Sequence, residues 1–212
     1  MKGILITFEG TEGSGKSTQI QLLAEHLRKL NRVVRVLREP GGTPIGEEIR
    51  HTLQHSAQNQ AMSYETELLL MNASRAQLVR QVIRPALAAG EVVLCDRFYD
   101  STTAYQGHGR GLDAGFVQAV IDFAVGSTRP HLTLLLNLPL ALSEARRQMR
   151  QTDKPIQRDR IEEADRRFFE RVEKGYQAIA AAEPQRVKVI DAAQTIEAVR
   201  DAIWNAVKPF LA

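Results

Sequence analysis

Residues 10–17 read Gly-Thr-Glu-Gly-Ser-Gly-Lys-Ser, and this G-x-x-x-x-G-K-[ST] pattern constrains the fold more than any other feature of the chain. It follows a short apolar run at 3–8 that is typical of a strand. It precedes apolar residues at helical spacing, from Ile20 to Leu30. A strand, a glycine-rich bend and a helix in this order predict a phosphate-binding loop, because backbone N–H groups and the positive end of the helix would face an anion.

Each specified position of this loop has a physical role. Gly10 and Gly15 let the backbone turn where a side chain would clash. Lys16 is expected to reach the β- and γ-phosphates of a nucleoside triphosphate, and the hydroxyl of Ser17 to ligate Mg²⁺. A dinucleotide-binding fingerprint is the rival interpretation, but Thr18 stands where its third glycine or alanine belongs. A site for pyrophosphate alone needs neither Lys16 nor Ser17, so we favour the triphosphate loop.

The composition is that of an ordinary globular protein. The chain has 212 residues, of which 43% are hydrophobic and 25% charged, so it is long enough for one large domain or two small ones. Its single cysteine, Cys95, excludes a disulfide within the chain. The N-terminus shows no basic and apolar leader, and no apolar run approaches the roughly 18 residues of a membrane span. We therefore expect a reducing, cytoplasmic setting and no membrane partner.

Short apolar runs alternate with helical patterns along the chain. The strands are expected at 3–8, 33–37, 92–95, 132–138 and 187–190, and the helices at 17–30, 44–55, 64–89, 113–125, 140–150, 160–182 and 195–207. Continuous apolar strands suit a parallel sheet that is covered on both faces. We therefore predict an α/β fold of three layers, with a five-stranded parallel sheet flanked by helices. Pro85 should kink or break the long third helix, and Gly90 should end it.

In an open parallel sheet, ligands bind beyond the carboxyl ends of the strands. The phosphate loop follows the first strand, and Asp96 and Arg97 follow the third. The sequence has no Asn-Lys-x-Asp segment to read guanine and no DxxG switch after the third strand, which disfavours a GTPase. A motor usually has two acids after that strand, whereas Arg97 suits an anionic second substrate. A metabolic kinase is therefore favoured over a hydrolase.

Basic residues are concentrated in one segment. Residues 144–160 contain six arginines and lysines and three acids, a difference equal to the net charge of +3 of the whole chain. The segment could be a solvated helix face or could bind nucleic acid, but it has no interleaved aromatic residues. Phosphoryl transfer needs positive charge at the moving group and exclusion of water, and a closing lid can supply both. We therefore interpret 144–160 as a basic lid.

Several segments together resemble those of the bacterial thymidylate kinase family. They are Phe8-Glu9-Gly10, Arg38-Glu39-Pro40-Gly41-Gly42-Thr43, Arg75, Asp96-Arg97-Phe98, Ser101 with Ala104-Tyr105-Gln106-Gly107, and Asp159-Arg160-Ile161-Glu162, and they span nearly the whole chain. The resemblance implies transfer of the γ-phosphate of ATP to dTMP, which gives dTDP for dTTP synthesis. It also implies Mg²⁺ as cofactor and a homodimer packed through helices. We expect one kinase domain over 1–212, with no nucleic acid as partner.

Candidate site residues follow from the loop and from the resemblance. The loop residues expected to bind ATP are Gly10, Thr11, Glu12, Gly13, Ser14, Gly15, Lys16, Ser17 and Thr18, and those expected to hold Mg²⁺ are Ser17 and Asp96. The resemblance places dTMP on Glu12, Arg38, Glu39, Met71, Arg75, Arg97, Thr102, Tyr105 and Gln106. The expected catalytic residues are Lys16, Arg97, Arg150, Arg158 and Glu12.

The resemblance also assigns roles on the acceptor side. Glu12 corresponds to a carboxylate near the sugar 3′-hydroxyl, and Arg97 to the arginine on the acceptor phosphate. Arg75 corresponds to an arginine that donates to a thymine carbonyl, and Tyr105 to an aromatic residue beside the deoxyribose. The remaining positions line the phosphate and metal region or the edge of the base, namely Arg38 and Glu39, and Thr102 and Gln106, respectively.

Two positions depart from the family pattern. Many relatives have phenylalanine four positions before the helix arginine, where Met71 stands here. The helical spacing of Met71 favours a core residue over a contact with the base, although its polarizable thioether could lie flat on a base. The lid reads Asp-Lys-Pro-Ile-Gln-Arg-Asp-Arg instead of Arg-Gly-x-Leu-Asp-Arg. We favour Arg150 for the transferring phosphoryl group, followed by Arg158. A kinase for another nucleoside monophosphate and a nucleic-acid-stimulated phosphate-loop ATPase stay open as alternatives.

Overall fold

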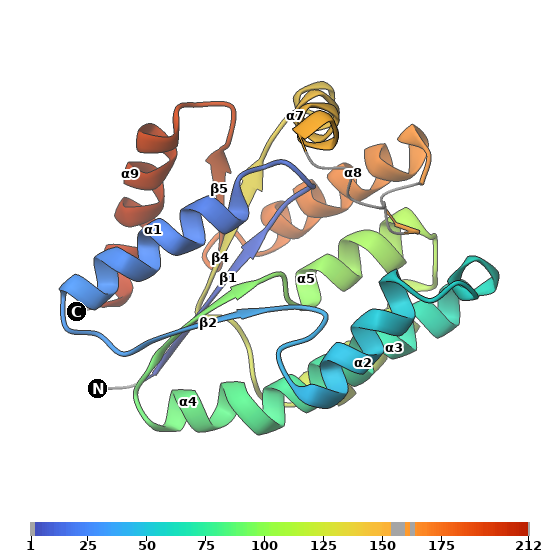
Figure 1. Ribbon diagram of the computed structural model, residues 1–212. Helices are drawn as coiled ribbons and strands as arrows, with labels where there is room; N and C mark the ends of the chain where they lie inside the picture. The colour runs from blue at the N-terminus through green and yellow to red at the C-terminus, as the bar shows by residue number, and fades with distance from the viewer. Residues whose placement is uncertain (1–2, 154–159, 162–163, 212) are drawn as a thin grey trace.

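A parallel sheet of five strands forms the centre of the fold. The computed structural model describes residues 3–153, 160–161 and 164–211, apart from the side chains at 147 and 150–153. The strands are β1 (Ile4–Glu9), β2 (Val34–Arg38), β3 (Val92–Asp96), β4 (Leu132–Asn137) and β5 (Val187–Asp191). They pair in the order β2-β3-β1-β4-β5, and each neighbouring pair is parallel. Figure 1 shows helices on both sides of this sheet, so the predicted three-layer α/β fold is confirmed.

The central strand β1 shows why the strands read as unbroken apolar runs. All six of its residues are buried, and successive side chains point to opposite faces of the sheet. Ile4, Ile6 and Phe8 enter one apolar cluster, and Leu5 enters another. A strand covered on both faces has no polar side to show, and apolar residues therefore follow one another.

Two helices cover the first face of the sheet. They are α1 (Lys16–Lys29) and α9 (Ile196–Val207), followed by the short η4 (Lys208–Phe210). Ile20, Leu23 and Leu27, three residues of the predicted helical stripe, pack into the cluster on this face. Because α1 starts at the end of the phosphate loop, this packing fixes the loop relative to the strands.

Among the described residues, four helical segments cover the second face of the sheet. They are α3 (Tyr64–Leu78), the π-helical η2 (Val79–Ile83), α4 (Arg84–Ala88) and α6 (Ala114–Val125). A third cluster joins α8 (Arg166–Ala182) to the π-helical η3 (Thr103–Gly109). The remaining helices are α2 (Pro44–Gln54), η1 (Asn59–Ala61), α5 (Tyr99–Thr102) and α7 (Leu140–Asp153). No helix in the described ranges has the length and apolar character to cross a bilayer.

The predicted helix at 64–89 is present but not uniform. Its α-helical turns widen into the π-helix η2 just before Pro85, which has no N–H to donate, and the predicted irregularity is confirmed. Gly90 follows the helix in the left-handed region, with φ 79°, and ends it as expected.

The start of one predicted helix was wrong, and one helical stretch was not predicted. The helix expected at 160–182 begins at Arg166, because the side chain of Asp165 accepts a hydrogen bond from the N–H of Phe168 at 2.7 Å and caps the helix there. The stretch from Tyr99 to Gly109 had no predicted helix, yet it forms α5 and η3. A π-helix closes i to i+5 hydrogen bonds, so its residues do not show the 3.6-residue pattern by which helices are found.

Candidate active site

The phosphate loop lies between the end of β1 and the first turn of α1. Gly10 has a φ of 127°, and a Cβ atom there would lie 2.4 Å from the carbonyl oxygen of Leu136. Gly15, the residue before α1, has a φ of 91°. Residues with a Cβ atom adopt such angles only with strain. The loop therefore bends where the motif requires, against the backbone of β4.

Two buried hydroxyl groups of the loop are suited to bind an anion. Thr11 is 6% exposed and Ser14 is 3% exposed, and neither hydroxyl has a hydrogen-bond partner in the described structure. An unsatisfied buried polar group costs about 1–3 kcal/mol, so such groups are normally paired. Phosphate oxygens in the loop would accept hydrogen bonds from both hydroxyls.

Lys16 folds back over the loop. Its Nζ atom donates to the carbonyl oxygens of Gly10 and Thr11, each at 3.1 Å. Burial, followed by the positive charge of Arg97, lowers the pKa of Lys16 to about 8. A polyphosphate would bring negative charge to the ammonium group and raise this pKa again. The protonated form of Lys16 should therefore be most stable when an anion is bound.

Ser17 and Asp96 provide oxygen ligands beside the loop. The hydroxyl of Ser17 donates to Oδ2 of Asp96 at 3.4 Å. Asp96 ends β3, which pairs with β1, so the residue lies next to the start of the loop. A hydroxyl and a carboxylate are hard oxygen donors of the kind that Mg²⁺ takes when it also binds substrate phosphates. These two residues fit Mg²⁺.

Arg97 connects the loop to the other half of the site. Its φ of 69° lies in the left-handed region, which is uncommon for an arginine and is often found at functional positions. Its Nη2 atom lies 2.5 Å from Oε1 of Glu12 and donates to the hydroxyl of Tyr105 at 3.1 Å. The guanidinium carbon lies 4.9 Å from the centre of the Tyr105 ring. The structure thus brings three predicted site residues into one cluster.

Arg75 is the centre of a second buried cluster. The side chain is 2% exposed, and its Nε and Nη2 atoms lie 2.8 and 2.7 Å from Oε2 of Glu39. Its Nη1 atom donates to Asn72 and to Thr102, both at 2.8 Å, and Nη2 also donates to the carbonyl oxygen of Phe98 at 3.2 Å. The other oxygen of Glu39, Oε1, is buried without a hydrogen-bond partner in the described structure. A base carbonyl that reached Arg75 would have to replace one of these protein acceptors.

Burial also acts on the charge of Glu39. It raises the pKa of this carboxyl group, and the positive charge of Arg75 opposes the rise. The two residues come from the end of β2 and from α3, 36 positions apart. Their pairing ties these elements together at the expected base and phosphate region.

Gln106 is held by an acid that the sequence analysis did not consider. Glu67 of α3 is 1% exposed and accepts from Nε2 of Gln106 at 2.9 Å. It also binds Arg110 at 2.9 Å and forms an ion pair with Arg160. Arg160, at the end of the predicted lid, donates in addition to the carbonyl oxygen of Met62 at 2.6 Å. These contacts join α3 and η3 to the last residue of the predicted lid.

Two other predicted residues, Arg38 and Met71, lie outside the clusters around Arg97 and Arg75. Arg38 forms a paired hydrogen bond with Glu47 at 2.9 and 3.0 Å, and both side chains are more than 40% exposed. Met71 is partly buried and belongs to none of the three apolar clusters among the described residues. These clusters give no support to a core role for Met71, and its contact with the base stays a prediction.

The start of the predicted lid packs on the phosphate loop. In α7, the hydroxyl of Ser143 donates to the backbone carbonyl of Glu12 at 2.6 Å, and Arg146 donates to that of Gly13 at 3.2 Å. Arg150 belongs to the same helix, but its side chain and the whole of Arg158 lie outside the described residues. The choice between these two arginines therefore stays a prediction.

Two buried site residues were missed. Glu9, the last residue of β1, has no exposed surface, and burial followed by the negative charge of Asp100 raises its pKa to about 7. Tyr176 of α8 lies 2.8 Å from Oε2 of Glu9 through its hydroxyl. An acid that ends an apolar strand was a visible signal for Glu9. Tyr176 gave none, because an aromatic residue in an amphipathic helix reads as core.

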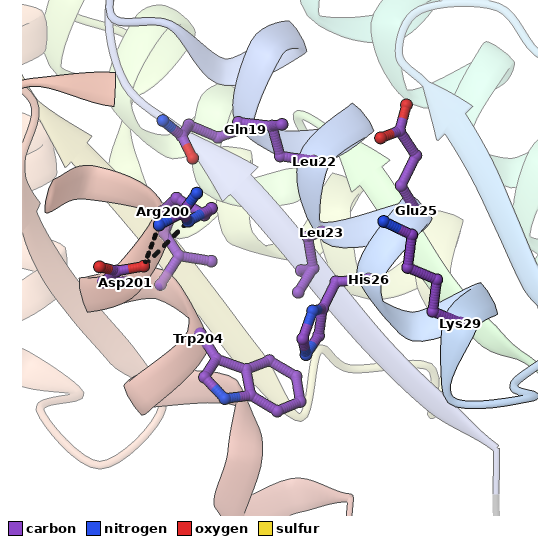
Figure 2. A pocket seen from close by; sticks show the side chains of 10 residues that line it. Gln19, Leu22, Leu23, Glu25, His26, Lys29, Arg200, Asp201 and Trp204 are labelled. Carbon is purple, nitrogen blue, oxygen red and sulfur yellow. Dashed lines mark hydrogen bonds and ion pairs between the residues drawn. The ribbon is translucent and has the colours of Figure 1, made fainter. Parts of the chain in front are cut away.

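A separate groove lies between α1 and α9 (Figure 2). It is lined by both helices, with Gln19 and His26 on one side and Arg200 and Trp204 on the other. The rings of His26 and Trp204 meet edge to face, with centres 4.2 Å apart. The groove includes none of the predicted site residues. The chemistry of the side chains, rather than this hollow, therefore locates the candidate active site at the phosphate loop.

The fold and the site together define a class of protein. A phosphate loop on this five-stranded parallel sheet, in contact with an arginine that follows the neighbouring strand, is the arrangement of a P-loop nucleoside monophosphate kinase. Within that class the chain belongs to the thymidylate kinase family, since the family model described as thymidylate kinase matches residues 8–203. The family expected from the resemblance is confirmed.

Individual relatives agree with this assignment. The chain is 47% identical to the thymidylate kinase of Alcanivorax borkumensis over 208 residues, which are 98% of this chain and 97% of the relative. It is 48% identical to that of Pseudomonas entomophila over 203 residues, or 96% and 94% of the two chains. The crystal structure of thymidylate kinase from Ehrlichia chaffeensis matches with a TM-score of 0.78 at 30% identity, covering 98% of this chain and all of the other.

Proposed function

We propose that the residues around the phosphate loop carry out the reaction of the thymidylate kinase family, in which ATP gives its γ-phosphate to dTMP and dTDP is formed. The observation that carries this proposal is the 2.5 Å contact between Arg97 and Glu12. It joins the arginine expected on the acceptor phosphate to the loop expected on the donor phosphates. Phosphoryl transfer depends mainly on such positioning, because the protein has little covalent chemistry to perform.

On the donor side, the loop N–H groups and Lys16 bind the phosphates of ATP. Phosphate oxygens replace the two backbone carbonyls as acceptors for Nζ of Lys16, which keeps the ammonium charged. Mg²⁺, held by Ser17 and Asp96, would supply further positive charge to the phosphate oxygens. Arg150, followed by Arg158, is proposed as the lid arginine that stabilises the transferring group.

On the acceptor side, the ion pair between Arg97 and Glu12 exchanges partners. The phosphate of dTMP takes the place of the Glu12 carboxylate on the guanidinium, and Glu12 turns to the 3′-hydroxyl of the sugar. Tyr105, whose ring already lies against Arg97, packs beside the deoxyribose. The residues proposed to line the base or the phosphate region are Arg38, Glu39, Met71, Arg75, Thr102 and Gln106.

A substrate panel tests this function against its alternatives. The enzyme is given ATP and Mg²⁺ with dTMP, UMP, CMP, GMP or AMP, or with single-stranded DNA. We expect phosphorylation of dTMP well above that of the other nucleotides. Equal use of another monophosphate would favour a different nucleotide kinase. DNA-stimulated ATP hydrolysis without phosphorylation of an acceptor would favour the ATPase.

We also propose that the chain is one kinase domain over 1–212, with a lid at about 144–160, and that it works as a homodimer in the cytoplasm. Three large apolar side chains support the dimer. Leu69 of α3 and Phe116 and Phe123 of α6 are 52%, 52% and 83% exposed, on helices that pack against each other. Phe123→Glu should therefore shift the mass measured by light scattering from dimer to monomer. Phe116 and Phe123 variants that leave the mass unchanged would place the interface elsewhere.

A further inference from the structure

Glu9 is a buried carboxylate whose contacts the phosphate loop does not require. It ends β1, has no exposed surface and immediately precedes the loop. Its Oε1 atom accepts from the backbone N–H of Phe98 at 2.7 Å. Its Oε2 atom accepts from the hydroxyls of Ser101 and Tyr176, at 2.5 and 2.8 Å. A carboxylate this deeply buried is retained only at a considerable desolvation cost, so its particular contacts call for an explanation.

The same two hydroxyls also contact Arg97. Nη1 of Arg97 donates to the hydroxyl of Ser101 at 3.1 Å and to that of Tyr176 at 3.2 Å. Each hydroxyl has one proton, and an ionised carboxylate can only accept. The two hydroxyl oxygens lie 3.0 Å apart, so either could also donate to the other. The ionised form of Glu9 is the stronger acceptor. When both protons go to it, the lone pairs of both oxygens are left for the guanidinium. Glu9 therefore sets the direction of the hydrogen bonds that hold Nη1.

The backbone around Arg97 is held by the end of β1, the strand that carries Glu9. The N–H of Arg97 donates to the carbonyl oxygen of Phe8 at 2.9 Å, and the next N–H, that of Phe98, donates to Glu9. These two bonds surround the residue with φ 69°. The end of β1 thus fixes both the backbone turn and one arm of the guanidinium, while the other arm, Nη2, faces Glu12 and Tyr105.

We propose that Glu9 is a positioning residue for acceptor recognition, which acts through Ser101 and Tyr176 to aim the guanidinium of Arg97 at the phosphate of the incoming nucleotide. This inference rests on the proposed role of Arg97 at the acceptor phosphate. Glu9 touches neither substrate. It holds Nη1 so that Nη2 is the arm that exchanges Glu12 for the phosphate.

Replacing the acid by its amide isolates this effect. Glu9→Gln keeps the size of the side chain and one acceptor for Phe98, but an amide N–H₂ turned to the hydroxyls donates where the carboxylate accepted. The hydroxyl protons then have no acceptor at position 9. They can turn toward Nη1 of Arg97, which is also a donor, and so disturb its position. A second variant, Tyr176→Phe, removes one of the two hydroxyls and keeps the ring. The matched control is Tyr99→Phe, because Tyr99 is also buried but packs against Arg129 and Arg186 instead.

The test compares dTMP with thymidine, which lacks the phosphate. Calorimetry on the full chain gives both dissociation constants for wild type, Glu9→Gln, Tyr176→Phe, Tyr99→Phe and Arg97→Ala. We expect Glu9→Gln to weaken dTMP about tenfold and to leave thymidine within about twofold, with a smaller effect of the same kind for Tyr176→Phe. In steady-state kinetics, KM for dTMP should rise while KM for ATP stays unchanged. Tyr99→Phe should leave the ratio of the two affinities as it is.

Different failures have different meanings. Equal weakening of dTMP and thymidine by Glu9→Gln, or no change in either, would overturn the positioning role while Arg97→Ala still abolishes the preference for dTMP. If Arg97→Ala itself keeps that preference, the proposed role of Arg97 fails, and the inference about Glu9 falls with it. Should Glu9→Gln not fold, Tyr176→Phe decides, since an unchanged ratio in that variant contradicts the relay.

Discussion

The donor and acceptor sides of this site are built in different ways. The proposed donor side is a run of consecutive residues, 10–17, in which we expect backbone groups and Lys16 to do most of the binding. The proposed acceptor side is assembled from side chains of several elements, held by the buried ion pair of Arg75 with Glu39 and the partly exposed ion pair of Arg97 with Glu12. The partners in these pairs are 36 and 85 positions apart.

This difference has consequences for stability. The loop conformation follows from local glycine geometry, and Lys16 is held there at a desolvation cost shown by its low pKa. On the acceptor side, removing one partner of the buried pair of Arg75 and Glu39 would leave an unpaired charge in the interior, which costs about 3–5 kcal/mol. Substitutions on the donor side should therefore reduce turnover in an intact fold, and those on the acceptor side should affect binding and stability together.

The largest effect should come from Arg75→Ala. It leaves Glu39 buried with no cation, so we expect unfolding in urea to lose about 3–5 kcal/mol, together with dTMP affinity. Arg38→Ala is the matched control, since its pair with Glu47 is half exposed and worth about 0–1 kcal/mol. Equal stability losses for the two variants would contradict the comparison. Unchanged discrimination between dTMP and CMP in Arg75→Ala would refute its contact with the base.

The next effect should come from Lys16→Ala. Loss of one transition-state donor typically lowers kcat about 10²–10³-fold, and we expect that loss here. The melting temperature should stay the same or rise, because a desolvated charge is removed. Lys29→Ala, at the exposed end of the same helix, should change neither quantity. Near-normal turnover of Lys16→Ala, measured at saturating ATP, would refute the donor site.

A smaller effect concerns the pH dependence of ATP binding. The pKa of Lys16 is about 8 without ligand, and the charged form binds phosphate. Below pH 8 the lysine is already protonated, so affinity should be nearly constant. Above pH 8 each binding event must take up a proton, and the dissociation constant measured by calorimetry should rise by up to about tenfold per pH unit. Lys16→Arg should remove this rise, and a flat profile in wild type would contradict the assigned pKa.

The smallest effect should come from Ser143→Ala. Ser143 lies in α7, and its hydroxyl donates to the backbone carbonyl of Glu12. A neutral hydrogen bond contributes about 0.5–1.5 kcal/mol to the free energy of unfolding. We expect a loss of that size in the free energy of unfolding and a modest rise in KM for ATP. KM for dTMP should not move, because the contact is to the backbone of the donor loop. A larger rise for dTMP than for ATP would show that the two sides are not separable at this point.

Local patterns in the sequence determined much of this protein. The five strands and their cover of helices follow from short apolar runs and from stripes such as Ile20 to Leu30. The phosphate loop follows from the spacing of Gly10, Gly15, Lys16 and Ser17. These features depend on neighbours within a few positions, so the order of residues is enough to find them.

Only the tertiary structure decided how the acceptor side is arranged. It paired Arg97 with Glu12 and directed the N–H groups of Arg75 to acceptors within the protein. It also placed Tyr176 of α8 beside Glu9 of β1. It also formed a π-helix at 103–109 that shows no helical period. The physical reason is that a side chain's direction and a buried charge's partner depend on packing between distant segments, which no local pattern records.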